Sequence, residues 1–133
     1  MAINIETFLS GYIGSAMWST HDYASEDDTE GYNLEDEFDS VSDACKAAML
    51  SDCTDFVDAQ KALLEQFKDE TGADDWRLGF LFWLNREGHG SGFWDEKSNC
   101  ASGDLLSDAC KPYGEFPLFG DFMMGVVRSH HFG

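Results

Sequence analysis

Hydrophobic residues recur between positions 5 and 17 at steps of three and four, which is the spacing of one face of an α-helix. Asn4 stands directly before this segment, where its side chain can cap the first turn. Inside the segment, Gly11 and Gly14 each cost about 1 kcal/mol relative to alanine. The spacing therefore predicts an amphipathic helix, and we expect its glycines to mark the close approach of a neighbouring backbone. The residues of the apolar face are Ile5, Phe8, Leu9, Tyr12, Ile13, Ala16 and Met17.

The helical spacing returns between positions 41 and 70. A sequence that resembles a capping box, S-V-S-D, begins at Ser40, with Asp43 in place of the usual glutamate or glutamine. The pattern fits one long helix or two helices joined near Ser51, and Gly72 ends it. Its expected apolar face comprises Cys45, Met49, Cys53, Phe56, Val57, Leu63, Leu64 and Phe67.

Residues 20 to 40 lie between these two segments and show little periodicity. They contain Gly31 and Asn33, which are residue types typical of turns. We expect a long surface loop here, with a helical turn near residues 34 to 38.

The second half of the chain has a different pattern. Aromatic and aliphatic residues form a near-continuous run in WRLGFLFWLN, followed by the glycine-rich sequence REGHGSG and then by Phe93 and Trp94. This order is typical of two strands joined by a loop. We therefore predict a β-hairpin with its turn around Gly88 to Gly92.

Two further elements are expected towards the C-terminus. Residues 103 to 113 predict a short helix that ends near Pro112. Its inward residues are expected to be Leu105, Leu106, Ala109 and Cys110. The sequence PLFGDFMMGVVR then predicts one or two strands, broken at Gly120 and Asp121.

Together these elements predict an α+β fold, with two or three N-terminal helices packed on one face of a small antiparallel sheet. A chain of 133 residues that is 43% hydrophobic fits a single folded domain, 1–133. Within it, residues 1–70 form an acidic helical half, and residues 74–128 form the hairpin, the helix and the further strands. We see neither a transmembrane span nor a signal peptide, so a cytoplasmic location is expected.

The four cysteines fit no CxxC pattern, because their separations are eight, forty-seven and ten residues. In a reducing cytosol we expect Cys45, Cys53, Cys100 and Cys110 to be free thiols of the core. A site using all four thiolates would need the fold to bring them together. A site of histidine and carboxylate is the other alternative, and its histidines are His21, His89, His130 and His131. We expect neither a metal nor a cofactor.

The charge of the chain is distributed unevenly. The net charge is −18, and residues 1 to 60 hold fourteen acids and one base, Lys46, so this part alone contributes −13. Such a charge argues against direct binding to nucleic acid or to an anionic membrane. The densest run has no lysine or arginine, and its acids are Asp22, Glu26, Asp27, Asp28, Glu30, Glu35, Asp36, Glu37 and Asp39.

This charge density is close to that of DNA. A duplex carries one negative charge per about 1.7 Å of axis, so eighteen charges correspond to about 30 Å. A compact domain of this length has a diameter of about 36 Å. We therefore predict that the acidic face imitates the phosphate array of nucleic acid and binds a protein with a basic nucleic-acid-binding groove. Acidity that serves only solubility is the alternative interpretation.

The glycine-rich loop offers a second hypothesis, a small enzyme or ligand-binding module centred on GHGSGFWD. Gly88, Gly90 and Gly92 allow close approach of a ligand to the backbone. In this interpretation His89 is a general acid or base, Asp95 orients it, and Arg86 grips an anion. The loop lacks GKS or GKT and the strand-to-helix context of GxSxG, so it is neither a phosphate loop nor a nucleophile elbow. The other interpretation of the loop is a simple turn.

A third hypothesis is an interaction protein in which the acidity is incidental. Its apolar anchor surface would consist of Trp83, Phe93 and Trp94. Aromatic residues at such positions belong more often to the core.

The sequence FWLNREGHGSGFWD resembles a motif of the form FWLTRNGHGAGFWD in a group of small acidic bacteriophage proteins. The resemblance extends to YIGSAMWSTHD and to KPYGEFPLFGD, and so covers parts of both halves of the chain. Glu87 replaces an asparagine of the motif, and MMGVVRSHHFG lies outside the similarity. The resemblance implies a phage-encoded accessory protein in the cytoplasm of a bacterium, and it implies no particular activity.

Combined with the charge, this origin suggests a non-enzymatic effector that inhibits a host protein. Candidate targets are a CRISPR effector, a restriction complex or another enzyme that handles DNA.

Overall fold

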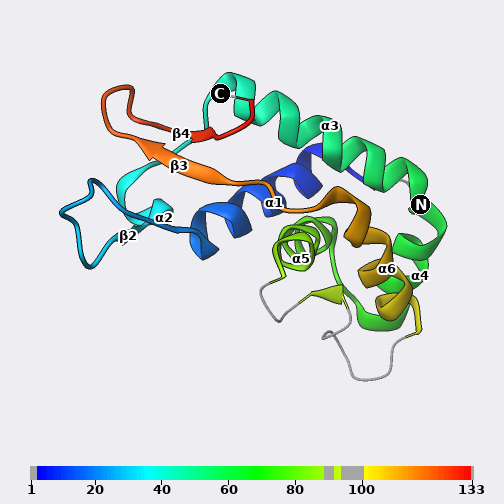
Figure 1. Cartoon of the computed structure of the whole chain (residues 1–133). Coiled ribbons are helices and arrows are strands. Elements are labelled where there is room, and N and C mark those ends of the chain that lie inside the picture. Colours follow the sequence, from blue (N-terminus) through cyan, green and yellow to red (C-terminus); the bar gives the residue numbers. More distant parts are fainter. Residues whose placement is uncertain (1–2, 89–91, 94–100, 133) are drawn as a thin grey trace.

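The computed structural model describes residues 3–88, 92–93 and 101–132. These residues form six α-helices, one short 3₁₀ helix and two two-stranded antiparallel sheets (Figure 1). The helices are α1 (Ile5–Ser19), α2 (Leu34–Glu37), α3 (Asp43–Ala59), α4 (Lys61–Thr71), α5 (Asp75–Glu87), α6 (Ala101–Cys110) and η2 (Lys111–Tyr113). The strands are β1 (His21–Asp22), β2 (Tyr32–Asn33), β3 (Leu118–Asp121) and β4 (Val126–Ser129). The mixture of helices and antiparallel strands is as predicted, whereas the helices are more numerous than the expected two or three.

Helices α1 and α5 cross at the centre of the molecule, and their backbones approach through glycine. A Cβ atom on Gly11 would overlap the carbonyl oxygen of Trp76, and one on Gly79 would overlap the carbonyl oxygen of Phe8. The close approach predicted at Gly11 is therefore confirmed. A Cβ on Gly14 would instead lie 3.4 Å from Cζ2 of the Trp76 side chain, which is an ordinary contact.

The β-hairpin predicted for residues 76 to 94 is wrong, because residues 75–87 form α5. Asp74 caps this helix by accepting a hydrogen bond from the Arg77 N–H at 2.8 Å, and Gly88 ends it in the left-handed conformation with φ of 68°. The near-continuous apolar run reflects a helix that is buried on most sides rather than a strand. Its buried apolar side chains are Leu78, Leu81, Phe82, Trp83 and Leu84. Of the predicted turn, residues 89–91 lie outside the described residues.

Helices α3 and α4 lie beside this central pair. The predicted apolar segment 41–70 forms two helices, and their junction is at Gln60 rather than near Ser51. Ser42, not Ser40, is the N-cap of α3, and its hydroxyl oxygen accepts from the Cys45 N–H at 3.1 Å. Asn4 caps α1 as predicted, by accepting from the Thr7 N–H at 3.0 Å.

Aromatic rings fill the core between these helices. Phe56 of α3 stacks on Phe82 of α5 with ring centroids 4.1 Å apart. Phe93 is fully buried, with its ring centroid 5.3 Å from that of Phe67. Helix α6 covers this side of the core with Leu106 and Cys110, as predicted, but Leu105 is 54% exposed, so its expected inward position is wrong.

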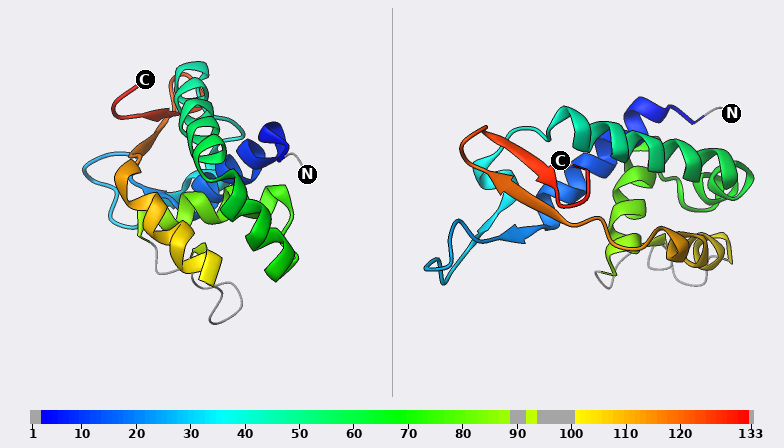
Figure 2. Two further views of the ribbon diagram at one scale, coloured as in Figure 1. Left: turned by 90° about the vertical axis from the view of Figure 1, so that its right-hand side faces the viewer. Right: turned by 45° about the horizontal axis from the view of Figure 1, so that its top comes forward.

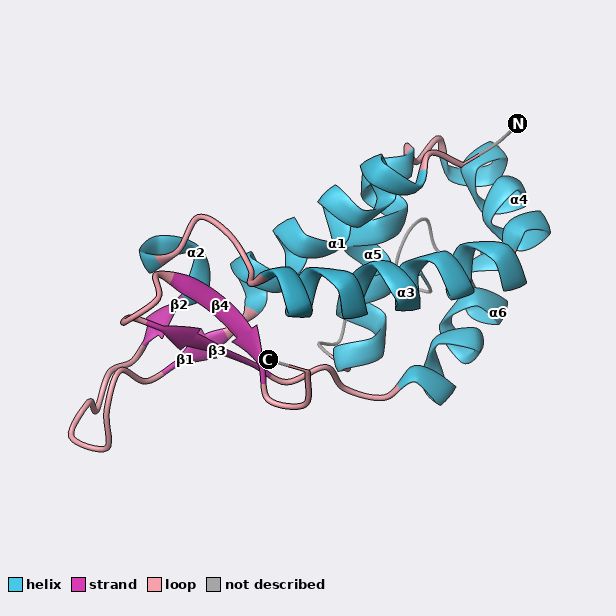
Figure 3. Cartoon of the chain, turned by 90° about the horizontal axis from the view of Figure 1, so that it is seen from above, coloured by secondary structure: helices cyan, strands magenta, loops and turns pink. Residues whose placement is uncertain are grey.

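The strands gather at the other end of the molecule, as Figures 1 and 3 show. Strand β1 pairs with β2, and β3 pairs with β4. The predicted strand segment 117–128 thus forms a second hairpin, β3–β4. The predicted break at Gly120 and Asp121 is wrong, because both residues lie within β3, and the β1–β2 pair was not predicted. A single sheet with helices on one face is not observed among the described residues. The molecule instead has a strand end and a helical body, and Figure 2 shows this division from two further sides.

Backbone hydrogen bonds join β4 to the segment between α2 and α3. Val127 of β4 donates to the carbonyl oxygen of Ser40 at 3.0 Å and accepts from the Ser42 N–H at 2.7 Å.

Among the described residues, no helix combines the length and the apolar character that a membrane span requires.

Candidate functional site

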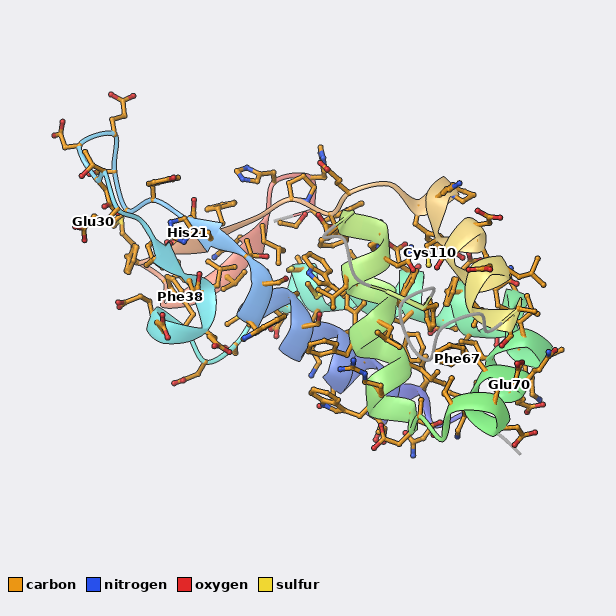
Figure 4. All side chains as sticks on the ribbon, turned by 90° about the horizontal axis from the view of Figure 1, so that it is seen from below. His21, Glu30, Phe38, Phe67, Glu70 and Cys110 are labelled. Carbon is orange, nitrogen blue, oxygen red and sulfur yellow. The ribbon has the colours of Figure 1, made fainter. Side chains whose placement is uncertain are left out.

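The acidic residues predicted from the sequence lie on one projecting segment, residues 21–39, which we call the acidic arm. It consists of β1, a loop, β2 and α2. The loop extends away from the helices, and Glu30 lies on it (Figure 4). Leu34 and Phe38 anchor the base of the arm in the core, where both side chains are buried. The helical turn predicted near residues 34 to 38 is present as α2.

The loop of the arm is organised by Asp28. Its Oδ1 accepts hydrogen bonds from the N–H groups of Glu30 at 3.2 Å and Gly31 at 3.0 Å, and its Oδ2 accepts from the Ala24 N–H at 3.0 Å. The bond from Ala24, followed by that from Gly31, lowers the pKa of the Asp28 carboxyl. Gly31 has φ of 71°, a conformation that favours glycine. The Asp28 carboxylate therefore shapes the loop.

A second acid, Asp22, joins the arm to the neighbouring hairpin. Its Oδ2 accepts from the hydroxyl of Tyr32 at 3.1 Å and from the N–H of Gly120 in β3 at 2.9 Å. Burial and the adjacent Asp22 carboxylate raise the pKa of Tyr32 to about 12. The Nε2 atom of His21 lies 2.9 Å from the carbonyl oxygen of Glu30, across the same loop. These bonds hold the arm in one shape.

The other seven acids of the arm are exposed. Their carboxylates belong to Glu26, Asp27, Glu30, Glu35, Asp36, Glu37 and Asp39. The arm contains no lysine or arginine, and none of its acids forms an ion pair with a base of residues 3–88, 92–93 or 101–132. Because no positive charge lies between them, these carboxylates create a strongly negative potential around the arm.

Four basic residues in the rest of the described chain pair with acids outside the arm. The pairs are Lys68 with Asp75, Arg86 with Asp52, Lys111 with Asp108, and Arg128 with Asp121. The acids of the helical body are therefore partly neutralised within the chain, while those of the arm are not.

Arg86, which the second hypothesis assigns to an anionic substrate, is buried and bound within the chain. Its Nη1 donates to Asp52 Oδ2 at 2.7 Å and to the Tyr12 hydroxyl at 3.0 Å. Its Nη2 and Nε donate to the carbonyl oxygens of Tyr113 and Gly114, both at 2.8 Å. Four of its five N–H donors are thus used to join α5 to α1, to α3 and to the end of η2 with the following Gly114.

His89 and Asp95, the other two residues of the second hypothesis, lie outside the described residues. The adjoining described residues pack tightly, because Asn85 Oδ1 accepts from the Phe93 N–H at 3.0 Å and from the Ser107 hydroxyl at 2.8 Å. Glu87 Oε1 accepts from the Phe116 N–H at 2.6 Å, and burial raises the pKa of the Glu87 carboxyl. These bonds, which the sequence did not indicate, connect the end of α5 to α6 and to the segment that leads to β3.

The chain matches no protein-family model, and no curated protein and no solved structure gives a significant match to it. A functional conclusion therefore rests on the residues themselves and on their geometry.

The apolar anchor of the third hypothesis is wrong for two of its three residues. Trp83 and Phe93 belong to the core, and the Trp83 indole N–H donates to the Ser19 hydroxyl at 2.8 Å. Trp94 lies outside the described residues.

The cysteine prediction is confirmed for the described thiols, since Cys45, Cys53 and Cys110 are free and buried. Burial raises the pKa of Cys45 to about 11, which disfavours the thiolate form at neutral pH.

Two exposed apolar surfaces were not predicted from the sequence. The first is a row of rings across α1 and α5, in which the centroid of Phe80 lies 5.6 Å from that of Trp18 and 5.3 Å from that of Trp76. The second is the turn between β3 and β4, where Phe122, Met123 and Met124 are exposed. The sequence does not show that rings from two separate helices form one exposed row. Nor does it show which residues of the strand-like segment 117–128 remain exposed.

Proposed function

We propose that this protein is a non-enzymatic, phage-encoded effector that binds and inhibits a host protein. The target handles nucleic acid or acts in defence, as a CRISPR effector or a restriction complex does. The acidic arm occupies the basic groove in which that target otherwise holds the phosphates of DNA or RNA. The phage origin is supported by the FWLNREGHGSGFWD motif, and the mode of binding by the arm.

One observation carries this proposal. Seven exposed carboxylates lie on a segment without a single lysine or arginine, and no base of the described residues pairs with them. A nucleic-acid-binding groove is lined with lysine and arginine that bind phosphates, so it complements such a surface. Attraction of this kind increases the association rate and is weakened by salt.

The internal contacts of the arm also support a recognition role over a role in solubility alone. Solubility depends on net charge and needs no particular shape. Asp28 and Asp22 nevertheless hold the loop and its base with five hydrogen bonds to other residues of the chain. An array that is ordered before binding loses less conformational entropy on association.

The test is a pull-down from bacterial lysate with the tagged full chain, eluted in salt steps and analysed by mass spectrometry. The arm variant is E26Q/D27N/E35Q/D36N, which leaves Asp22 and Asp28 in place. The control variant, D58N/D69N/D104N/E115Q, removes the same number of exposed acids outside the arm. We expect the wild type and the control to retain a nucleic-acid-binding protein that elutes between low and moderate salt, and the arm variant to lose it.

The outcomes separate this proposal from its alternatives. Equal retention by the arm variant and the wild type would exclude nucleic-acid mimicry. Equal loss in both variants would show that total charge matters rather than the arm. An H89A variant, assayed for inhibition of the host protein, tests the second hypothesis. Loss of inhibition by a variant that still retains the partner in the pull-down would favour chemistry at the glycine-rich loop.

A further inference from the structure

The turn between β3 and β4 exposes three consecutive apolar side chains. Met123 is 97% exposed, Met124 is 65% exposed and Phe122 is 50% exposed. Single exposed apolar residues are common on protein surfaces, but adjacent ones at a projecting turn often mark a binding site. We call residues 121–125 the hairpin tip.

The backbone of the hairpin tip is fixed by its first residue. Asp121 Oδ1 accepts from the N–H groups of Met123 and Met124, both at 3.1 Å, and Asp121 Oδ2 pairs with Arg128 Nε at 2.7 Å. Gly125 closes the turn with φ of 70° and donates to the Asp121 carbonyl oxygen at 2.8 Å. The two methionines are therefore presented on a rigid turn, which lowers the entropy cost of binding through them.

The hairpin tip is attached directly to the acidic arm. The Phe122 ring centroid lies 5.0 Å from that of Phe38 in the arm and 5.2 Å from that of Tyr32. The Gly120 N–H donates to Asp22, as described above. The tip and the arm therefore project from the same end of the molecule, as Figure 1 shows.

The charges around the hairpin tip identify the partner surface that complements it. Asp121 and Arg128 neutralise each other beside the turn. In the arm, Glu37 and Asp39 flank Phe38, whose ring contacts Phe122, and both acids are exposed. The tip is thus an apolar point with carboxylates on its arm side, and an apolar pocket with a rim of lysine or arginine is its complement.

We propose that Met123 and Met124 are the apolar anchor of the interface formed by the arm, and that they insert into an apolar pocket beside the basic groove of the same partner. This inference rests on the proposed function of the arm. Methionine is unbranched and adapts to irregular pockets. Buried apolar anchors mainly slow dissociation, whereas exposed charges mainly speed association, so the two parts have separate roles.

The experiment is a displacement assay. Proteins of a bacterial lysate are bound to duplex DNA on cellulose, and the purified full chain is added at increasing concentration. The readout is the concentration that releases half of each bound protein. The variants are the arm variant, the tip variant M123S/M124S and the control L105S, which changes an exposed leucine of the helical body.

We expect the half-release concentration to rise at least tenfold for the tip variant and to stay within twofold for L105S. The salt dependence of release by the tip variant should equal that of the wild type, because all carboxylates remain. Release by the tip variant at the wild-type concentration would overturn the anchor and leave the arm proposal intact. Release of nothing by the wild type would overturn both, and a weakened tip variant beside an unchanged arm variant would refute a shared interface.

A second measurement needs no substitution. Hydrogen peroxide transfers one oxygen atom to a methionine thioether, giving the polar sulfoxide, and is itself reduced to water. Met123 and Met124 are open to this reaction, whereas Met17 and Met49 are only 7% and 0% exposed. Mild oxidation should therefore weaken the wild type as M123S/M124S does and should leave that variant unchanged. Sulfoxide at both positions, verified by peptide mass spectrometry, with no loss of displacement would overturn the inference.

Discussion

The strand end and the helical body use the same residue type in opposite ways. In the helical body, Asp74 caps α5, Asp52 pairs with Arg86, and Asp55 accepts from the Tyr113 hydroxyl at 2.6 Å. In the acidic arm, only Asp22 and Asp28 have such partners within the described residues. The remaining seven arm carboxylates face solvent.

The acidic residues of this chain therefore fall into two groups, those that bond within the fold and those that face solvent. Asp52, Asp55 and Asp74 of the helical body satisfy donors that the fold would otherwise leave unpaired, so they contribute to stability. The seven exposed carboxylates of the arm repel one another and have no such bond among the described residues, so their clustering fits the proposed recognition of a partner.

The largest effect is expected at Arg86, where the helical body depends on one buried charge. R86M leaves Asp52, the Tyr12 hydroxyl and the carbonyl oxygens of Tyr113 and Gly114 without their donor. The free energy of unfolding should fall by about 3 kcal/mol, as measured by urea denaturation. The matched variant K111M, at an exposed pair, should change it by less than about 0.5 kcal/mol. A similar loss of unfolding free energy in both variants would show that the hydrogen bonds of Arg86 do not stabilise the helical body more than an exposed ion pair does.

The next effect concerns the crossing of α1 and α5. G79A should lower the free energy of unfolding by about 1–3 kcal/mol, because the new Cβ overlaps the carbonyl oxygen of Phe8. In G14A the new Cβ would make only an ordinary contact, 3.4 Å from Trp76 Cζ2, so this variant should stabilise the protein by up to about 1 kcal/mol, since alanine is the better helix former. Thermal unfolding measures both. A stable G79A would mean that the helices separate without cost.

The arm should contribute little to stability. The variant E26Q/D27N/E35Q/D36N should unfold within about 0.5 kcal/mol of the wild type in urea, because none of these side chains has a partner among the described residues. The same variant is expected to lose its binding partner. A large loss of stability would show that the arm charges have a structural role, and the comparison with the helical body would then fail.

The smallest effect isolates the one acid that shapes the loop. The Asp28 carboxyl has a pKa below its usual value of 3.8. Its contribution to the stability of the loop is therefore complete above about pH 3.8, and it is lost as the pH falls through the pKa of the folded protein. The amide resonances of Ala24, Glu30 and Gly31 should shift together in this range. NMR titration tests this, and the shift should be absent in D28N and retained in D27N. A shared shift centred above 3.8 would contradict the assignment.

The sequence predicted part of this fold because some signals are local. Asn4, Gly11 and the apolar face of α1 are interpreted correctly from spacing alone. Helix α5 was not, because a helix buried on most sides loses its amphipathic pattern and looks like a buried strand. The meaning of Gly88 depends on this distinction, since left-handed glycine ends a helix as readily as it forms a hairpin turn.

The candidate site divides in the same way. The charge of the arm is a property of its own residues, so the sequence shows it directly. Asp22 and Asp28 differ from the exposed acids because they accept hydrogen bonds from backbone N–H groups. Only the fold brings those groups, such as the Gly120 N–H, into reach. The hairpin tip was missed because the exposure of Met123 depends on how Phe122 packs against the arm.

The hydrogen bond from Gly120 to Asp22 joins residues 98 positions apart. During synthesis, the acidic segment therefore leaves the ribosome long before β3 and β4 can hold it. A truncated chain that lacked residues 118–129 would contain every arm carboxylate, yet it could not form the hydrogen bond from Gly120 that holds Asp22 at the base of the arm. The charge of the arm is available early, but its shape forms late, so the proposed recognition of a partner would require the two distant segments to have met.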